Sequence, residues 1–224
     1  LPEAAKLAGF DPGYFAPGWD GNVSGHLASK GKQRPPTADG EGGGFDATVD
    51  VPSLSGKLRG RPLQGRGKFA LRGDQGEGDL ALTLGNSKVD AKGKVGDKID
   101  IAANLQPLQL DDLLPDAAGT LRGNVLLKGN RDTPDITADL AGSGVKWSGY
   151  AAESLSIKGR LPWRGGGGEL AVRGTHVAAG MALDSLRIDA RGAIENLELD
   201  GDARNAMGAV ALSGNARRTG ARWQ

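Results

Sequence analysis

The sequence predicts an all-β protein whose single long, meandering antiparallel sheet curls into an open, U-shaped groove with a hydrophobic interior. Three observations support this fold class. Apolar and polar residues alternate over short runs, as in strands with one apolar and one solvated face. Glycine accounts for 38 of the 224 residues, against a usual share of about 7%. Hydrophobic residues make up only 38% and aromatic residues 4%, which leaves little material for a closed, dense core.

The alternating runs define the expected strands. Leu80, Leu82 and Leu84 share one face, because alternate side chains of a strand point the same way. Runs with the same period lie at 99–105, 136–140, 155–157, 177–183, 186–190 and 197–199. Glycine-containing turn sequences separate the runs, at 73–74, 85–86, 96–97, 129–130, 165–168 and 201–202.

A loose internal repeat underlies these runs. Five expected strands are flanked by glycines six residues apart, at Gly25 and Gly31, Gly67 and Gly73, Gly123 and Gly129, Gly168 and Gly174, and Gly208 and Gly214. The second residue inside each pair is large and apolar: Leu27, Phe69, Val125, Leu170 and Val210. The spacing between pairs is irregular, which suits a few-stranded unit stacked along an axis rather than a propeller of equal blades.

Other segments are expected to be helix or loop. Residues 2–8 and 111–114 each predict one helical turn, and the Gly-, Lys- and Pro-rich residues 30–44 predict a long loop. Because the chain starts without methionine and ends without a terminal signal, we interpret residues 1–224 as one segment of a repetitive groove domain cut from a larger protein.

The apolar strand faces are the candidate functional surface. An exposed apolar surface of this extent normally marks a binding site, and aliphatic walls without polar anchors suit hydrocarbon chains. The predicted groove-lining residues are Leu27, Phe69, Leu71, Leu80, Leu82, Leu84, Ile99, Ile101, Val125, Leu127, Ile136, Leu140, Leu155, Ile157, Leu170, Val172, Leu186, Ile188, Leu197, Leu199, Val210 and Leu212. An ordinary closed β core would give the same alternation, so that alternative stays open here.

Catalysis, cofactor binding and nucleic-acid binding have little support. The net charge is +1, with 28 basic and 27 acidic residues interspersed, so no phosphate-binding stripe for nucleic acid forms. Cysteine is absent, and His26 and His176 lack partners at metal-ligand or catalytic spacing. Asp111 and Asp112 are interpreted as a turn-initiating pair. We therefore expect no enzyme, no metal and no cofactor.

The four tryptophans, Trp19, Trp147, Trp163 and Trp223, are expected to cap sheet edges. A membrane-facing rim is the alternative.

One stretch carries a family resemblance. Residues 110–123, read as LDDLLPDAAGTLRG, continue through 127–129, 134–140 and 145–147. This stretch resembles the repeating signature of the TamB family, the AsmA-like envelope proteins of Gram-negative bacteria. Residues 15–31 echo the same unit, with Gly21, Gly25 and Gly31 spaced as Gly119, Gly123 and Gly129 are.

The resemblance implies a β-taco fold with a hydrophobic interior, in a protein that is anchored in the inner membrane and spans the periplasm. It implies an anchor outside residues 1–224 and a partnership with TamA, an outer-membrane barrel of the Omp85 type. It also implies roles in phospholipid transport to the outer membrane and in outer-membrane protein assembly. The leading hypothesis is a periplasmic bridge segment that conducts phospholipids by their acyl chains. Alternatives are a chaperone-like scaffold for outer-membrane proteins and autotransporters, and a solenoid adhesin.

Overall fold

The computed structural model describes residues 3–14, 18–34, 44–219 and 222–223. Most of them are in strands, and the fold class is all-β as predicted. The elements are β1 Glu3–Phe10, η1 Pro12–Tyr14, β2 Gly21–Arg34, β3 Gly44–Leu58, β4 Arg61–Arg72, β5 Gln75–Leu84, β6 Ser87–Val95, β7 Lys98–Gln109, α1 Leu110–Leu113, β8 Ala118–Asn130, β9 Pro134–Trp147, β10 Tyr150–Leu161, β11 Gly168–Ala178, β12 Ala182–Ala193, β13 Asn196–Asn205, β14 Gly208–Thr219 and β15 Arg222–Trp223.

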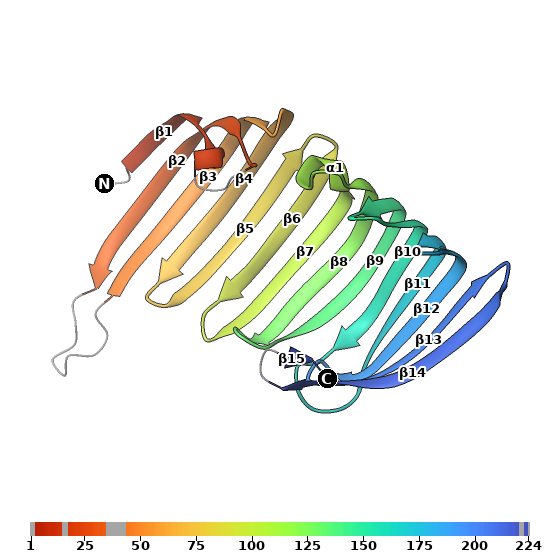
Figure 1. The fold of residues 1–224 in the computed structure, drawn as a ribbon. Helices are drawn as coiled ribbons and strands as arrows, with labels where there is room; N and C mark the ends of the chain where they lie inside the picture. The colour runs from red at the N-terminus through yellow and green to blue at the C-terminus, as the bar shows by residue number, and fades with distance from the viewer. Residues whose placement is uncertain (1–2, 15–17, 35–43, 220–221, 224) are drawn as a thin grey trace. The chain divides into compact units, whose positions relative to one another are not determined.

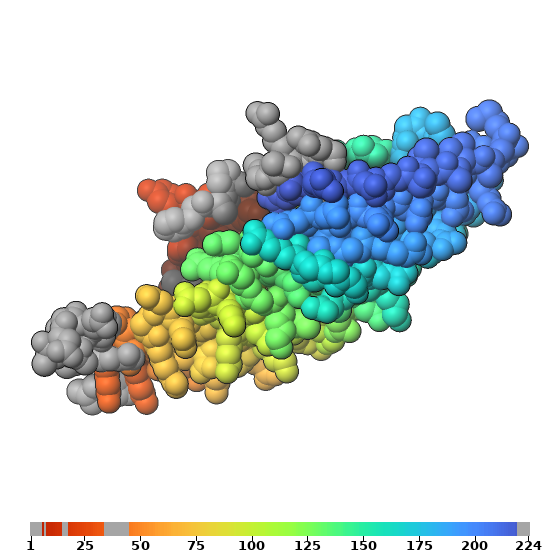
Figure 2. Space-filling model, turned by 90° about the horizontal axis from the view of Figure 1, so that it is seen from below, coloured from red at the N-terminus to blue at the C-terminus, as the bar shows by residue number. Residues whose placement is uncertain are grey.

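The strands form an antiparallel meander. Their order in the sheet is their order in the chain, from β1 to β15, so each strand pairs with the strands before and after it (Figure 1). The first and last strands stand at opposite ends of this order, and the sheet is not closed into a barrel. The chain divides into two compact units, Leu1–Ala103 and Asn104–Gln224. In the space-filling view, the cyan-to-blue strands of the second unit lie side by side (Figure 2).

Glycines on the sheet make room for the side chains of neighbouring strands. A Cβ atom on Gly142 in β9 would lie 2.8 Å from Val145 Cγ2 and 3.0 Å from Leu121 Cδ2. Gly123 in β8 has φ +126° and a Cβ there would collide with the Asp139 carbonyl oxygen. An L side chain rarely adopts that φ. Glycine is therefore required at position 123 for two reasons: the positive φ of the backbone and the lack of space for a side chain.

Three expectations about local structure are wrong. Residues 2–8 were expected to be helical, but β1 starts at Glu3 and pairs with β2 from Glu3↔Ser29 to Leu7↔Gly25. The backbone hydrogen bonds between β1 and β2 outweigh the helix propensity of this Ala-rich sequence. The run at 177–183 is divided, because β11 ends at Ala178 and β12 begins at Ala182. The expected turn at 201–202 lies inside β13, where Gly201 pairs with Ile188 and Leu212.

The expected loop at 30–44 is wrong at both margins. Residues 30–34 continue β2 and pair with the start of β3, with Gly31 opposite Ala47. The absence of a side chain at Gly31 leaves room for the Phe45 ring, whose Cζ would lie 2.5 Å from a Cβ there. The rest of the expected loop, 35–43, lies outside the described residues. The helical turn expected at 111–114 is confirmed with a shift of one residue, as α1.

No helix among the described residues is long and apolar enough to cross a membrane.

Replacing Gly123 by alanine should destabilise the protein by about 1–3 kcal/mol, because the new Cβ strains a backbone that alanine rarely adopts. The measurement is the free energy of unfolding in urea. Gly214→Ala is the matched control, since Gly214 also flanks a repeat strand but has no atom within 4 Å of its added Cβ. Equal losses for the two variants would contradict the role assigned to Gly123.

Candidate functional site

The registers of β8 to β14 collect apolar residues on one face of the second unit. Three cross-strand rows on this face contain only Gly, Ala, Val, Leu and Ile. The first is Leu121, Gly142, Leu155, Gly174, Leu186, Ala203 and Val210; the second is Gly123, Leu140, Ile157, Val172, Ile188, Gly201 and Leu212; the third is Val125, Ala138, Gly159, Leu170, Ala190, Leu199 and Gly214. A fourth row includes Leu127, Ile136, Leu161 and, farther along the sheet, Gly192, Leu197 and Ala216. We call these rows the apolar face of the second unit.

Every groove-lining residue predicted between 125 and 212 lies on this face. The sequence located the individual alternations, and the register brings them into the same rows. Large aliphatic residues often stand opposite glycine, as Leu155 does between Gly142 and Gly174. The face is therefore aliphatic across seven strands. That these residues contact acyl chains stays a prediction.

The first unit repeats this arrangement. Phe69, Leu71, Leu80, Leu82 and Leu84 lie on one face, with Phe69 opposite Gly78, Leu80 opposite Gly67 and Leu84 opposite Leu63.

Three other predicted residues of this unit are placed less regularly. Ile101 lies beside Gly93, where an added Cβ would be 3.0 Å from Ile101 Cγ1. Ile99 is buried. Leu27 pairs with Ala5 of β1 and lies at the irregularity between His26 and Ala28 on the β3 side.

Exposure along the apolar face of the first unit is uneven. Val23, Leu63 and Leu84 form a buried row, with Leu84 only 2% exposed. Leu71, near the other end of β4, is 46% exposed. One end of this face is thus packed by the protein and the other is open to solvent, so the predicted lining residues are not equally accessible.

One end of the apolar face of the second unit is also covered. Leu161, Ala190 and Ile194 form a buried cluster, against which Trp163 packs. Four predicted lining residues belong to the same packed region: Ile136, Leu170, Leu197 and Leu199. The segment after β10 therefore fills part of the surface that the sequence predicts to be open, and Trp163 acts as a cap.

Hydrogen bonds and a ring contact fix the position of Trp163. Its backbone N–H donates to Asp135 Oδ1 at 2.9 Å, and its indole Nε1–H donates to Glu195 Oε1 at 3.2 Å. The Arg218 guanidinium lies 4.9 Å from the ring centroid. The hydrogen bond from Trp163, together with one from Arg160, lowers the pKa of Asp135. Asp135 consequently stays ionised, and keeps these bonds, at any pH above its ordinary pKa of about 3.9.

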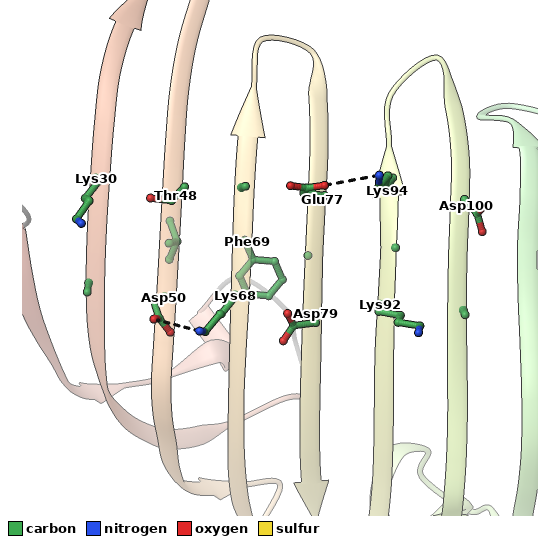
Figure 3. A pocket seen from close by; sticks show the side chains of 16 residues that line it. Lys30, Thr48, Asp50, Lys68, Phe69, Glu77, Asp79, Lys92, Lys94 and Asp100 are labelled. Atoms are coloured by element: carbon green, nitrogen blue, oxygen red, sulfur yellow. Dashed lines mark ion pairs between the residues drawn. The ribbon is translucent and has the colours of Figure 1, made fainter.

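The polar face of the first unit contains a hollow of about 830 Å³, and sequence reasoning missed it. Half of its lining residues are charged, and they alternate in sign along one row: Asp50 on β3, Lys68 on β4, Asp79 on β5 and Lys92 on β6 (Figure 3). Of the lining residues, four are lysines and four are acidic, so the hollow is close to neutral. Its ion pairs are long, as in the 3.9 Å between Lys68 Nζ and Asp50 Oδ2, and contribute at most about 1 kcal/mol each.

Each histidine lies beside a polar side chain of a neighbouring strand. His26 Nδ1 lies 3.2 Å from Ser53 Oγ, and His176 Nδ1 lies 2.7 Å from Glu153 Oε2. Within the described part of the chain, no group of three His, Cys, Asp or Glu residues is placed to hold a metal ion.

Comparison with known proteins decides the family. The family model described as "TamB, N-terminal domain" matches residues 3–224. The chain belongs to the TamB family. It is 26% identical to the translocation and assembly module subunit TamB of Haemophilus influenzae, over 227 aligned residues that cover 98% of this chain. The chain spans 17% of the length of that relative. No solved structure matches.

Replacing Trp163 by alanine should destabilise the protein by about 2–4 kcal/mol, because it removes a large side chain from a packed cluster. Trp147→Ala is the matched control, since Trp147 is 55% exposed and its loss should change the free energy of unfolding by less than about 0.5 kcal/mol. Denaturant unfolding measures both variants. Indistinguishable effects would show that Trp163 does not cap the apolar face.

Proposed function

We propose that this segment holds phospholipid acyl chains on the apolar faces of its sheet and passes them from strand to strand. In this proposal it is one section of a longer, repetitive hydrophobic groove in the periplasm, within a protein anchored in the inner membrane. The observation that carries the proposal is the composition of the three rows on the second unit, which hold aliphatic residues and glycine only.

The energetics favour such a surface. Each methylene exposed to water costs about 0.8 kcal/mol. A two-chain lipid carries on the order of 30 methylenes, so its passage through water costs on the order of 20 kcal/mol. A continuous aliphatic surface removes most of that cost. With no hydrogen-bonding or charged side chain in the three rows, no single point along the strands holds a tail more tightly than the next, which suits movement along the face.

Two findings support the setting. The chain belongs to the TamB family, and its relative is named a subunit of a translocation and assembly module. A module requires other subunits, and the resemblance implies an Omp85-type outer-membrane barrel like TamA as the partner. These findings support our proposal that the segment belongs to a path for phospholipids between the inner and outer membranes, which would support outer-membrane biogenesis.

Photo-crosslinking in cells tests lipid contact. A photoreactive amino acid at Leu82 or Val125 should give lipid adducts, because both side chains lie on apolar faces. The matched controls are Thr83 and Asn124, which are adjacent to Leu82 and Val125 on the same strands and whose side chains point to the opposite face. Phospholipid adducts absent from all four positions, or equally frequent at all four, would contradict the proposal.

A chaperone-like scaffold is the second candidate, and the outer edge of β14 favours it. In the part of the chain that the structure describes, β15 pairs with this edge only at Arg218 and Thr219. Val210 and Leu212 on the same strand are 57% and 70% exposed. An exposed strand edge is a template for adding another strand, such as one from a nascent outer-membrane protein.

Native mass spectrometry of the purified segment separates the two candidates. If the segment is part of a lipid path, its mass spectrum should show added masses that match bound phospholipid. These added masses should disappear after lipid extraction. A segment that carries no lipid but forms crosslinks with outer-membrane protein strands through β14 would favour the scaffold instead.

A further inference from the structure

A band of hydroxyl groups crosses the polar face of the second unit. The registers place Thr120, Ser143, Ser154, Thr175, Ser185 and Arg204 in one row on six successive strands. Ser154 Oγ and Thr175 Oγ1 are 2.7 Å apart. Each hydroxyl can donate or accept a hydrogen bond, so the row offers donors that rotate to suit an anion.

Two arginines stand directly beside this row. Arg173 on β11 and Arg187 on β12 are cross-strand partners. Like charges directly opposite each other destabilise a strand pair. A single carboxylate, Asp189, is shared between them: Arg173 Nη2 donates to Asp189 Oδ1 at 2.6 Å, and Arg187 Nε donates to Asp189 Oδ2 at 2.7 Å. Asp189 thus accepts hydrogen bonds from both guanidinium groups, and Asp202, the partner of Arg187 on β13, lies 3.9 Å from Arg187 Nε.

The arginine pair is held in a fixed orientation. Arg173 Nη1 also donates to the carbonyl oxygens of Val172 and Ile188, at 2.9 and 3.1 Å. Asp189 is only 3% exposed, so its carboxylate lies beneath the guanidinium groups. The side chains of Arg173 and Arg187 remain 42% and 53% exposed. Groups ordered in advance lose less freedom when a ligand binds.

These groups border a hollow of about 490 Å³ in the second unit. Its polar lining residues are Arg173, Arg187, Ser154, Ser156, Thr175 and Ser185, and Ala141, Gly142, Leu155, Gly174 and Leu186 complete the lining. Arg122 lies in the same row as Ser156, and Arg204 is the partner of Ser185. Against these arginines stand Asp189 and Asp202, the latter 3.9 Å from Arg187 Nε. Asp200 also lies near Arg187 but pairs with a further arginine, Arg191, at 2.9 Å. The band is therefore net positive, unlike the nearly neutral hollow of the first unit.

We propose that this hollow is a binding site for a phosphate-type anion, a phosphomonoester or phosphodiester group. The Arg173 and Arg187 guanidiniums contact its oxygens, and the hydroxyls of Ser154, Thr175 and Ser185 donate to it. Guanidinium groups match the geometry of phosphate and form charge-assisted hydrogen bonds with it. The arginine, serine and threonine side chains alternate along their strands with the leucines of the apolar face, so these polar groups point to the opposite side of the sheet.

Titration calorimetry on the full chain tests the site, with inorganic phosphate as the ligand and sodium chloride at matched ionic strength as the reference. Phosphate should bind, and Arg187→Gln should weaken its affinity about tenfold. The matched control is Arg191→Gln, because Arg191 lies on the same strand and face, is 49% exposed and pairs with Asp200. This control should change the affinity less than about twofold.

Because Arg187→Gln removes a partner of the buried Asp189, it could weaken binding by disturbing the fold. A second variant therefore changes only hydroxyl groups and keeps Asp189, Arg173 and Arg187. Ser154→Ala with Thr175→Val should keep the thermal transition and weaken phosphate binding several-fold. Vesicles of phosphatidylglycerol and of phosphatidylcholine, tested in parallel, identify the source of the group. Binding to phosphatidylglycerol vesicles that Arg187→Gln abolishes and Arg191→Gln does not would assign a lipid headgroup, and binding of inorganic phosphate alone would assign a soluble one.

Three results would overturn the proposal. The first is that neither inorganic phosphate nor phosphatidylglycerol vesicles bind above the chloride reference. The second is that Arg187→Gln and Arg191→Gln weaken binding equally, because that pattern describes general surface charge. The third is that both vesicle types bind equally while phosphate does not.

Discussion

The cross-strand register is the constraint on which this structure depends. Side chains alternate between the faces of a strand, so a slip of one residue in any pairing would move a whole strand's apolar set to the polar side. Seven strands of the second unit keep the rows aligned from Leu121 to Val210. Irregularities are placed where the rows end. His176 has φ 44°, and the next residue, Val177, is buried and lies where a Cβ on Gly174 would be 2.7 Å from its Cγ2.

The two faces of the sheet are stabilised by different interactions. On the second unit the rows of the apolar face are aliphatic, with Trp163 packed against one end, and glycines make room for the leucines of neighbouring strands. The polar face of the second unit is held by ion pairs and hydroxyl contacts between strands, with Asp189 as its most buried charge. Arg173 and Arg187 lower the pKa of Asp189, because both donate hydrogen bonds to its carboxylate. That carboxylate stabilises the folded state at any pH above its ordinary pKa of about 3.9, and the contribution fades as the pH falls below it.

Much of the fold could be predicted from the sequence, because alternation reports which residues share a face within a strand. That is why residues such as Leu155 and Ile188, expected on one surface, do lie on it. The hollows of the polar faces could not be found this way. Ser154 and Thr175 are 21 residues apart and meet only through pairing, and local periodicity carries no information about register. The sequence predicted Trp163 as a cap of a sheet edge but not its place against the apolar face, because Trp163 reaches Glu195 across 32 residues.

The meander has a consequence for how the length of such a protein varies. Each strand contacts its neighbours in the chain, so a hairpin of two strands is a self-contained increment. Duplicating or deleting one leaves chain direction and side-chain facing unchanged on both sides of the junction. Strands are spaced about 4.8 Å apart, so each hairpin changes the sheet's extent by about 10 Å. Losing a single strand would instead reverse the direction of every later strand in the sheet. Such proteins should therefore gain or lose strands in pairs.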